Sequence, residues 1–140
     1  MPRNGRKAAG LASLYEQVLR TVYEKRGPAD LQPAQWSALR FFRRAGASAR
    51  TVSGLANFLG VTMGPASRTA RTLRRRGFLT SSKNPKDARS IIFTLTGTGN
   101  SILKMDPLLR LARAMEALDA KDQVVFTRVI GNLYDELDSQ

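Results

Sequence analysis

The sequence predicts a mainly α-helical protein with one small β-hairpin. Apolar residues recur at three- and four-residue steps along most of the chain, which is the spacing of one face of a helix. After Gly77 the spacing changes to about two residues, over residues 78–83 and 90–95, which indicates two strands. A chain of 140 residues with 42% hydrophobic content suits one core, so we expect a single domain over residues 1–140.

The first part of the chain predicts two helices. An apolar stripe at helical spacing covers residues 8–26, and Gly27-Pro28 ends it. Pro33 suits the first turn of a second helix, which Gly46 stops. The aromatic residues of this region could stack on bases, but at helical spacing we expect them in the core. The apolar stripe of the first helix consists of Leu11, Leu14, Val18 and Val22, and that of the second includes Trp36, Leu39 and Phe42. The aromatic residues are Trp36, Phe41, Phe42 and, further along the chain, Phe58.

A tight turn joins the next two predicted helices, after a short polar link over residues 47–50. Thr51 is placed to cap the first of them and Thr62 to cap the second, with Gly60 turning the chain between them. Ala56, Gly60 and Ala66 have the spacing of a helix-turn-helix, which needs a small residue, a turn residue and an apolar residue at these places. An ordinary hairpin of two helices shares this spacing, so the spacing alone leaves both open.

The remainder predicts the hairpin and two further helices. The hairpin turns around residues 84–89 and has a basic tip. Thr96 is placed to cap a long helix that reaches Leu118 and bends at Pro107, whose ring removes a backbone hydrogen bond. Asp119 then caps a last helix, whose apolar face is too broad for a terminal helix to leave in water. That face consists of Val125, Phe126, Val129, Ile130, Leu133, Tyr134 and Leu137.

Basic residues are concentrated in the middle of the chain. The formal net charge is +12, and between Leu31 and Lys86 there are eleven Lys and Arg residues and no acid. After Ser90, seven acids outnumber five bases. This asymmetry predicts a polyanionic partner, with a solvated basic face as the plainer alternative. The eleven bases are Arg40, Arg43, Arg44, Arg50, Arg68, Arg71, Arg74, Arg75, Arg76, Lys83 and Lys86.

The composition excludes several kinds of chemistry. The chain has no cysteine and no histidine, so it has no thiolate nucleophile, disulfide, cysteine or histidine zinc site, or imidazole acid–base catalysis. We therefore expect no enzymatic activity, no metal and no cofactor. No apolar run is long enough for a membrane span or a secretory signal, so we expect a cytoplasmic, nucleoid-associated protein without a membrane partner.

Seven short motifs occur in a fixed order between Leu31 and Leu103. They are Leu31-Gln-Pro-Ala-Gln-Trp36, Leu55-Ala56, Leu59-Gly60-Val61-Thr62, Leu73, Gly77-Phe78-Leu79, Asp87-Ala-Arg89 and Leu95-Thr96-Gly-Thr-Gly99. Their order and spacing resemble the MarR family of bacterial transcriptional regulators. The chain departs from the family pattern at Gly54, where a glutamate usually completes the helix cap, and at Ala88, where a charged residue is common.

The resemblance implies a winged helix-turn-helix region over residues 31–96, flanked by dimerisation helices over residues 8–26 and 98–138. A two-fold homodimer would bind a palindromic operator in double-stranded DNA. The helix after Thr62 would enter the major groove, and the hairpin would reach the minor groove through Arg89, with Asp87 orienting that arginine. Family members are often released from DNA by a small phenolic or anionic ligand. Such a ligand could bind in a pocket lined by Tyr15, Arg40, Arg43 and Arg44, but solvated or phosphate-facing arginines are the favoured alternative. The dimer interface is expected at Leu11, Leu14, Val18, Phe126, Val129, Ile130, Leu133, Tyr134 and Leu137.

Helical geometry sorts the residues that would contact DNA. Counting from Thr62, Ala66, Ala70 and Leu73 face the core, and the side of the helix that carries Arg68 faces outward. We expect Arg68 to contact a guanine, with phosphate binding alone as the alternative. Pro65 could touch a thymine methyl or be purely structural, and Arg76 is expected to make a cap contact. Arg89 could instead only pair with Asp87. The predicted DNA-binding residues are Arg50, Thr62, Gly64, Pro65, Ser67, Arg68, Arg71, Arg74, Arg75, Lys83, Lys86 and Arg89.

The sequence thus predicts a sequence-specific DNA-binding regulator of transcription, acting as a repressor. The main alternative is an architectural, nucleoid-type protein that binds DNA without regard to sequence. An RNA-binding module would need a sheet or an aromatic platform, and neither is evident. An enzyme would need a nucleophile with a base, and no such pair is visible.

Overall fold

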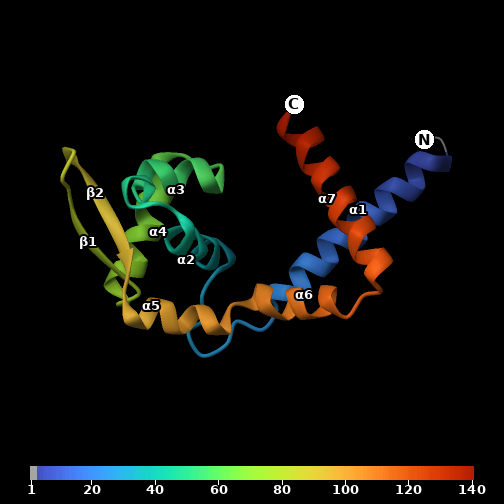
Figure 1. Ribbon diagram of the computed structural model, residues 1–140, viewed down its shortest axis with the longest axis horizontal. Helices are drawn as coiled ribbons and strands as arrows, with labels where there is room; N and C mark the ends of the chain where they lie inside the picture. Colours follow the sequence, from blue (N-terminus) through green and yellow to red (C-terminus); the bar gives the residue numbers. More distant parts are fainter. Residues whose placement is uncertain (1–2) are drawn as a thin grey trace. The chain divides into compact units, whose positions relative to one another are not determined.

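A computed structural model describes residues 3–140, and its elements follow the predicted order (Figure 1). The chain divides into two compact units, residues 1–106 and 107–140. The first unit contains α1 (Arg3–Tyr23), α2 (Pro33–Arg44), η1 (Ala47–Ala49), α3 (Val52–Leu59), α4 (Met63–Arg75), β1 (Leu79–Asn84), β2 (Asp87–Leu95), α5 (Gly97–Ile102) and η2 (Leu103–Met105). The second unit contains α6 (Pro107–Glu116) and α7 (Ala120–Asp138).

The predicted fold class, mainly α with a β-hairpin, is confirmed, although several boundaries move. The first helix begins at Arg3 and ends at Tyr23, earlier than expected at both ends. The polar link before Thr51 forms a short 3₁₀ turn, η1. The second strand starts at Asp87, because the connection between the strands is shorter than predicted.

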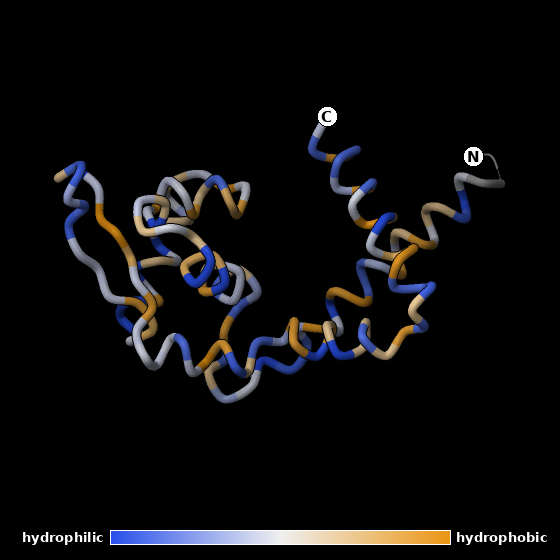
Figure 2. Tube along the Cα trace, in the orientation of Figure 1, coloured by the Kyte–Doolittle hydropathy of each residue, from blue (hydrophilic) through white to orange (hydrophobic). Residues whose placement is uncertain are grey.

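The core of the first unit lies between α2, α3, α4 and the hairpin. Phe42 of α2 and Phe93 of β2 are buried, and their ring centroids are 5.7 Å apart. Phe41 is half-buried and stacks on Phe58, which is exposed, so the expectation that Phe58 is a core residue is wrong. Figure 2 shows apolar segments along the elements that meet here. The other fully buried large side chains are Leu31, Leu39, Leu55, Leu73 and Leu79.

The long helix expected after Thr96 is broken into separate pieces. α5 ends at Ile102, η2 follows, and Asp106 leaves the helical conformation with ψ of 124°. A residue that precedes proline is disfavoured in the helical region, whereas proline suits the first turn of a helix. Pro107 therefore begins a new helix, α6, rather than bending an existing one.

Three of the four predicted caps form. The side chains of Thr51 and Thr96 accept hydrogen bonds from the backbone N–H of Gly54 and Gly99, three residues on, each at 3.0 Å. Asp119 accepts from the N–H of Lys121 at 3.2 Å. Thr62 precedes α4 as expected, but its side chain makes no cap hydrogen bond. The residue three positions on is Pro65, which has no N–H to donate.

The hairpin is paired along its length and tied through β2 to the segment before α3. β1 and β2 pair antiparallel from Leu79 opposite Leu95 to Asn84 opposite Asp87, with an irregularity between Lys83 and Asn84. The N–H of Phe93 also donates to the carbonyl of Arg50 at 2.8 Å, which ties β2 to the segment before α3. The part of the hairpin near Phe93 is therefore attached to the helix-turn-helix region.

Within residues 3–140, no helix is long and apolar enough to cross a membrane.

Candidate nucleic-acid interface

The exposed face of α4 carries the residues predicted to read DNA. Ala66, Ala70 and Leu73 are buried, as expected from the helical spacing. Gly64, Pro65, Arg68 and Arg71 are exposed on the other side, whereas Ser67 is half-buried. The structure thus confirms which side of α4 is available to a partner, with Ser67 at its margin.

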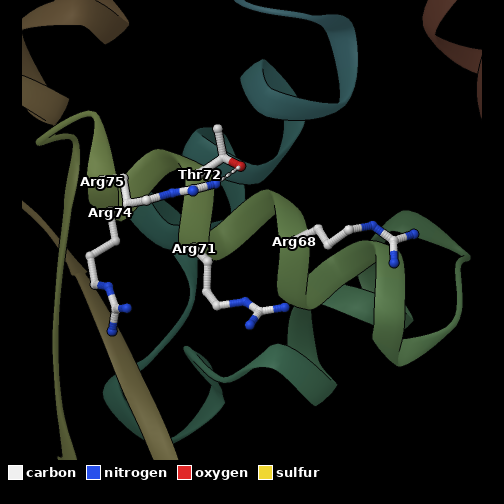
Figure 3. A pocket seen from close by; sticks show the side chains of 5 residues that line it. All are labelled: Arg68, Arg71, Thr72, Arg74 and Arg75. Carbon is white, nitrogen blue, oxygen red and sulfur yellow. Dashed lines mark hydrogen bonds between the residues drawn. The ribbon is translucent and has the colours of Figure 1, made fainter.

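Arginines gather along this exposed face. Arg68, Arg71, Arg74 and Arg75, together with Thr72, line a surface pocket of about 360 Å³ (Figure 3). Arg75 donates to the Thr72 hydroxyl at 3.3 Å. Arg74 donates to the Ser81 hydroxyl at 3.1 Å, which links α4 to β1. Because Arg74 leans towards the hairpin, Arg68, Arg71 and Arg75 remain the cations most open to a ligand.

The charge of this face is not neutralised by acids of the same region. The ion pairs among the described residues are Arg20 with Glu16, Arg26 with Asp30 and Arg40 with Asp106, and none involves α4 or the hairpin. Since residues 31–86 contain no Asp or Glu, the positive potential over α4 is uncompensated locally. Such a surface attracts a polyanion.

The tip of the hairpin is basic and internally braced. Lys83, Lys86 and Arg89 are exposed. The Asn84 side chain accepts from the N–H of Lys86, and the Asp87 carboxylate accepts from the N–H of Arg89, both at 3.0 Å. Asp87 thus holds the backbone of Arg89, and no ion pair joins the two side chains among the described residues. That Asp87 helps to orient Arg89 towards DNA stays a prediction.

Arg76 and Arg50 are engaged with the rest of the fold. Arg76 is the C-cap residue of α4, and its N–H donates to the carbonyl of Thr72 at 3.0 Å, so the expected cap contact is confirmed. Its guanidinium in addition donates to the carbonyl of Ala29 and lies over the Phe78 ring, 5.3 Å from the centroid. Arg50 is half-buried and its Nε is enclosed without a hydrogen-bond partner, so it offers less to a partner than an exposed arginine would.

Close packing explains why position 54 is a glycine, which the sequence did not reveal. A Cβ atom at this position would lie 2.2 Å from the carbonyl oxygen of Ala49 and 3.1 Å from Cζ of Phe41. Any larger residue would push α3 away from η1 and α2. The departure from the usual glutamate therefore permits close packing, while Thr51 still caps the helix.

Arg40 is committed to an internal cluster. It binds Asp106 and also donates to the Tyr23 hydroxyl at 3.1 Å. Burial by itself lowers the pKa of the Arg40 guanidinium, but the hydrogen bonds to Asp106 and Tyr23 and their coulombic attraction outweigh it and raise the pKa above its ordinary value. Arg40 is thus neither solvated nor free for a ligand, whereas Arg43 and Arg44 are exposed.

Met63 is an exposed residue of the α4 face that sequence reasoning missed. It occupies the first position of α4 and is the one large apolar side chain of that helix outside the core. The spacing of Met63 from Ala66 and Ala70 would place it on the buried side of the helix, so the local pattern did not signal its exposure.

Apolar side chains are also exposed on α1 and α7. On α1 they include Leu11, Leu14 and Val18. On α7, Val129, Leu133, Tyr134 and Leu137 are exposed, while Phe126 and Ile130 are half-buried. These are the residues predicted to form a dimer interface, and single helices rarely leave so much apolar surface in water.

The helix-turn-helix of α3 and α4, with the hairpin beside it, defines a winged helix-turn-helix protein. Residues 29–90 match the model of the MarR family. The match covers the helix-turn-helix and most of the hairpin and confirms the resemblance that the order of the motifs predicts.

Solved structures share this fold across nearly the whole chain. FabT of Streptococcus pneumoniae, in complex with DNA, is 19% identical, with a TM-score of 0.76 over 97% of this chain and 98% of that one. MarR is 24% identical, with a TM-score of 0.68 over 95% and 98%. BpsR of Bordetella bronchiseptica, studied for regulation of its DNA binding by 6-hydroxynicotinic acid, is 17% identical, with a TM-score of 0.71 over 92% and 98%. No curated protein matches the sequence.

Proposed function

We propose that this member of the MarR family binds double-stranded DNA in a sequence-specific manner and represses transcription. One observation carries the proposal: the exposed side of α4 presents arginines that have no acidic partners. The first turn of the same helix has no large polar side chain. Recognition helices read base edges with their first turns and hold phosphates further along. On this basis Arg68 is proposed to read a guanine, and Arg71 and Arg75 are proposed to bind phosphates.

The hairpin supports the same mode of binding. Its exposed Lys83, Lys86 and Arg89 lie beyond α4, and a narrow minor groove concentrates negative potential that attracts arginine. The hydrogen bond from Arg74 to Ser81 couples the hairpin to α4, so both elements would approach DNA as one body. FabT in complex with DNA has the same fold.

We propose that the functional form is a homodimer on a palindromic operator. The exposed apolar residues of α1 and α7 are the surfaces that a second copy would cover. A two-fold dimer presents two copies of α4, and half-sites repeated with the same symmetry would match them. A dimer seated across such a site would exclude other proteins from that DNA, which is why we propose repression.

A small phenolic or anionic effector would release the DNA. Support comes from the fold shared with BpsR, whose DNA binding is regulated by 6-hydroxynicotinic acid. Arg43 and Arg44 are exposed and could attract an anion, whereas Arg40 would have to leave Asp106 first. The proposed location is the cytoplasm, in association with the nucleoid, and we propose no catalytic activity.

The test is a mobility shift with DNA from around the protein's own gene, at about 150 mM salt and with excess random competitor. We expect a discrete complex that survives the competitor and is lost with Arg68→Ala. Arg113→Ala, which removes an exposed arginine of α6, serves as the matched control and should leave the complex intact. If random DNA competes as well as the operator, the protein is an architectural DNA-binding protein and the proposal is wrong.

A further inference from the structure

Met63 breaks the pattern of α4. The other apolar side chains of this helix, Ala66, Ala70 and Leu73, are fully buried, but the Met63 side chain is 53% exposed. Val61, two residues earlier in the turn, is 42% exposed. The start of the helix thus presents apolar surface at a place where the rest of the exposed face is polar and basic.

Met63 is exposed because it is the first residue of α4, although its spacing from Ala66 and Ala70 is that of the buried side of the helix. Side chains in a helix lean towards its N-terminus, so a residue in the first position extends beyond the start of the helix. The neighbouring Gly64 adds no bulk, and a Cβ atom there would meet only Nη1 of Arg68, at 3.6 Å. Thr62 makes no side-chain cap that would cover this end. Met63 therefore lies uncovered at the tip of the helix.

The major groove offers one apolar group to such a side chain. The base edges there carry hydrogen-bond donors and acceptors, with the C5 methyl of thymine as the exception. Methionine has no donor and only a weak acceptor, but it is flexible and polarisable and packs well against apolar groups. We propose that Met63 contacts the methyl group of a thymine and makes the protein prefer thymine at that position of each half-site. This inference rests on the proposed function of α4 as the helix that reads DNA.

The geometry of α4 also limits where that thymine lies. Met63 and Arg68 are five residues apart, which corresponds to about 7.5 Å along a helix axis. Base pairs in B-DNA are spaced about 3.4 Å apart, so this axial distance corresponds to at most about two to three base pairs. The preferred thymine and the guanine read by Arg68 should therefore lie within the same half-site, a few base pairs from each other.

The experiment begins with duplexes selected by the protein from a random library, followed by footprinting of the selected site. Each thymine within the footprint is then replaced by deoxyuridine, which removes only the C5 methyl. At one position per half-site we expect the substitution to weaken binding of the unmodified protein about three- to fivefold, the effect of uncovering one methyl group. Met63→Ala should bind the thymine duplex more weakly by a similar factor and lose nothing further on deoxyuridine.

Met105→Ala is the matched control, because Met105 is equally exposed, at 54%, but lies outside the helix-turn-helix. This variant should keep the full response to deoxyuridine, and thermal unfolding should show that both variants fold. The inference is overturned if Met63→Ala retains the same response as the unmodified protein, since the two changes would then be independent. It is also overturned if no deoxyuridine substitution weakens binding. A selection that returns no preferred duplex contradicts the proposed function itself, and the inference with it.

Discussion

Arg40 and Asp106 form a two-pronged ion pair that joins α2 to the last residue of the first unit. Nε of Arg40 lies 2.7 Å from Oδ2 of Asp106, and Nη2 lies 2.7 Å from Oδ1. The two side chains are 16% and 10% exposed, so water screens them little. The pair holds Asp106 against α2.

Replacing Arg40 by Met should destabilise the protein markedly. The substitution leaves the Asp106 carboxylate largely enclosed without its cation, and breaking one side of a buried ion pair costs about 3 kcal/mol or more. The free energy of unfolding in urea measures the effect. Arg20→Met, which breaks the exposed pair with Glu16, should change it by less than about 1 kcal/mol. Equal effects of the two substitutions would show that the Arg40 pair is no stronger than a surface pair.

Gly99→Ala should weaken the joint between the hairpin and α5. A Cβ atom at Gly99 would lie 2.2 Å from the carbonyl oxygen of Phe78, so either the helix or the strand must shift. Overpacking of this kind costs about 1–3 kcal/mol, which exceeds the gain from the better helix former. Gly97→Ala, two residues earlier, meets nothing within 4 Å and should leave the thermal midpoint nearly unchanged. Similar midpoints for the two variants would contradict the close approach at Gly99.

Arg75→Ala should weaken DNA binding to every sequence by a similar factor. Arg75 lies beyond the first turns of α4, where side chains meet phosphates rather than bases. Losing one phosphate contact should reduce the slope of log affinity against log salt by about 1. Affinities for the operator and for random DNA at several salt concentrations test this. A loss confined to the operator would instead assign Arg75 to base reading.

Leu133→Glu should convert the proposed dimer into monomers. Leu133 is 51% exposed on the apolar side of α7, and an interface would have to bury the new charge. Sedimentation of the purified variant should give the mass of one chain, and its affinity for the operator should fall because each half-site binds alone. Asn132→Glu places the same charge on the preceding residue, which lies outside the predicted interface. This variant should remain dimeric. If both variants remain dimeric, α7 is not part of the dimer interface.

Local signals in the sequence were sufficient for most of the fold. The apolar spacing located the helices, and Thr51, Thr96 and Asp119 marked three helix starts correctly. The side of α4 that is exposed followed from the positions of Ala66, Ala70 and Leu73. Such features depend on residues within one or two turns, so the sequence contains all the information that they need. The failures of local reading were Thr62 and Pro107, where the missing N–H or the ring of a proline overrode the expected pattern.

The sequence by itself determined the resemblance to the MarR family, the order of the elements, the basic face of α4 and the hairpin, and the absence of cysteine and histidine chemistry. The tertiary structure alone decided which cations are available to a partner. Arg40 is paired with a residue 66 positions away, and Arg76 reaches a carbonyl 47 positions away. It also decided that Gly54 and Gly99 permit close packing and that Met63 is exposed. These outcomes depend on which distant segments pack together, and the local spacing of residues does not predict that packing.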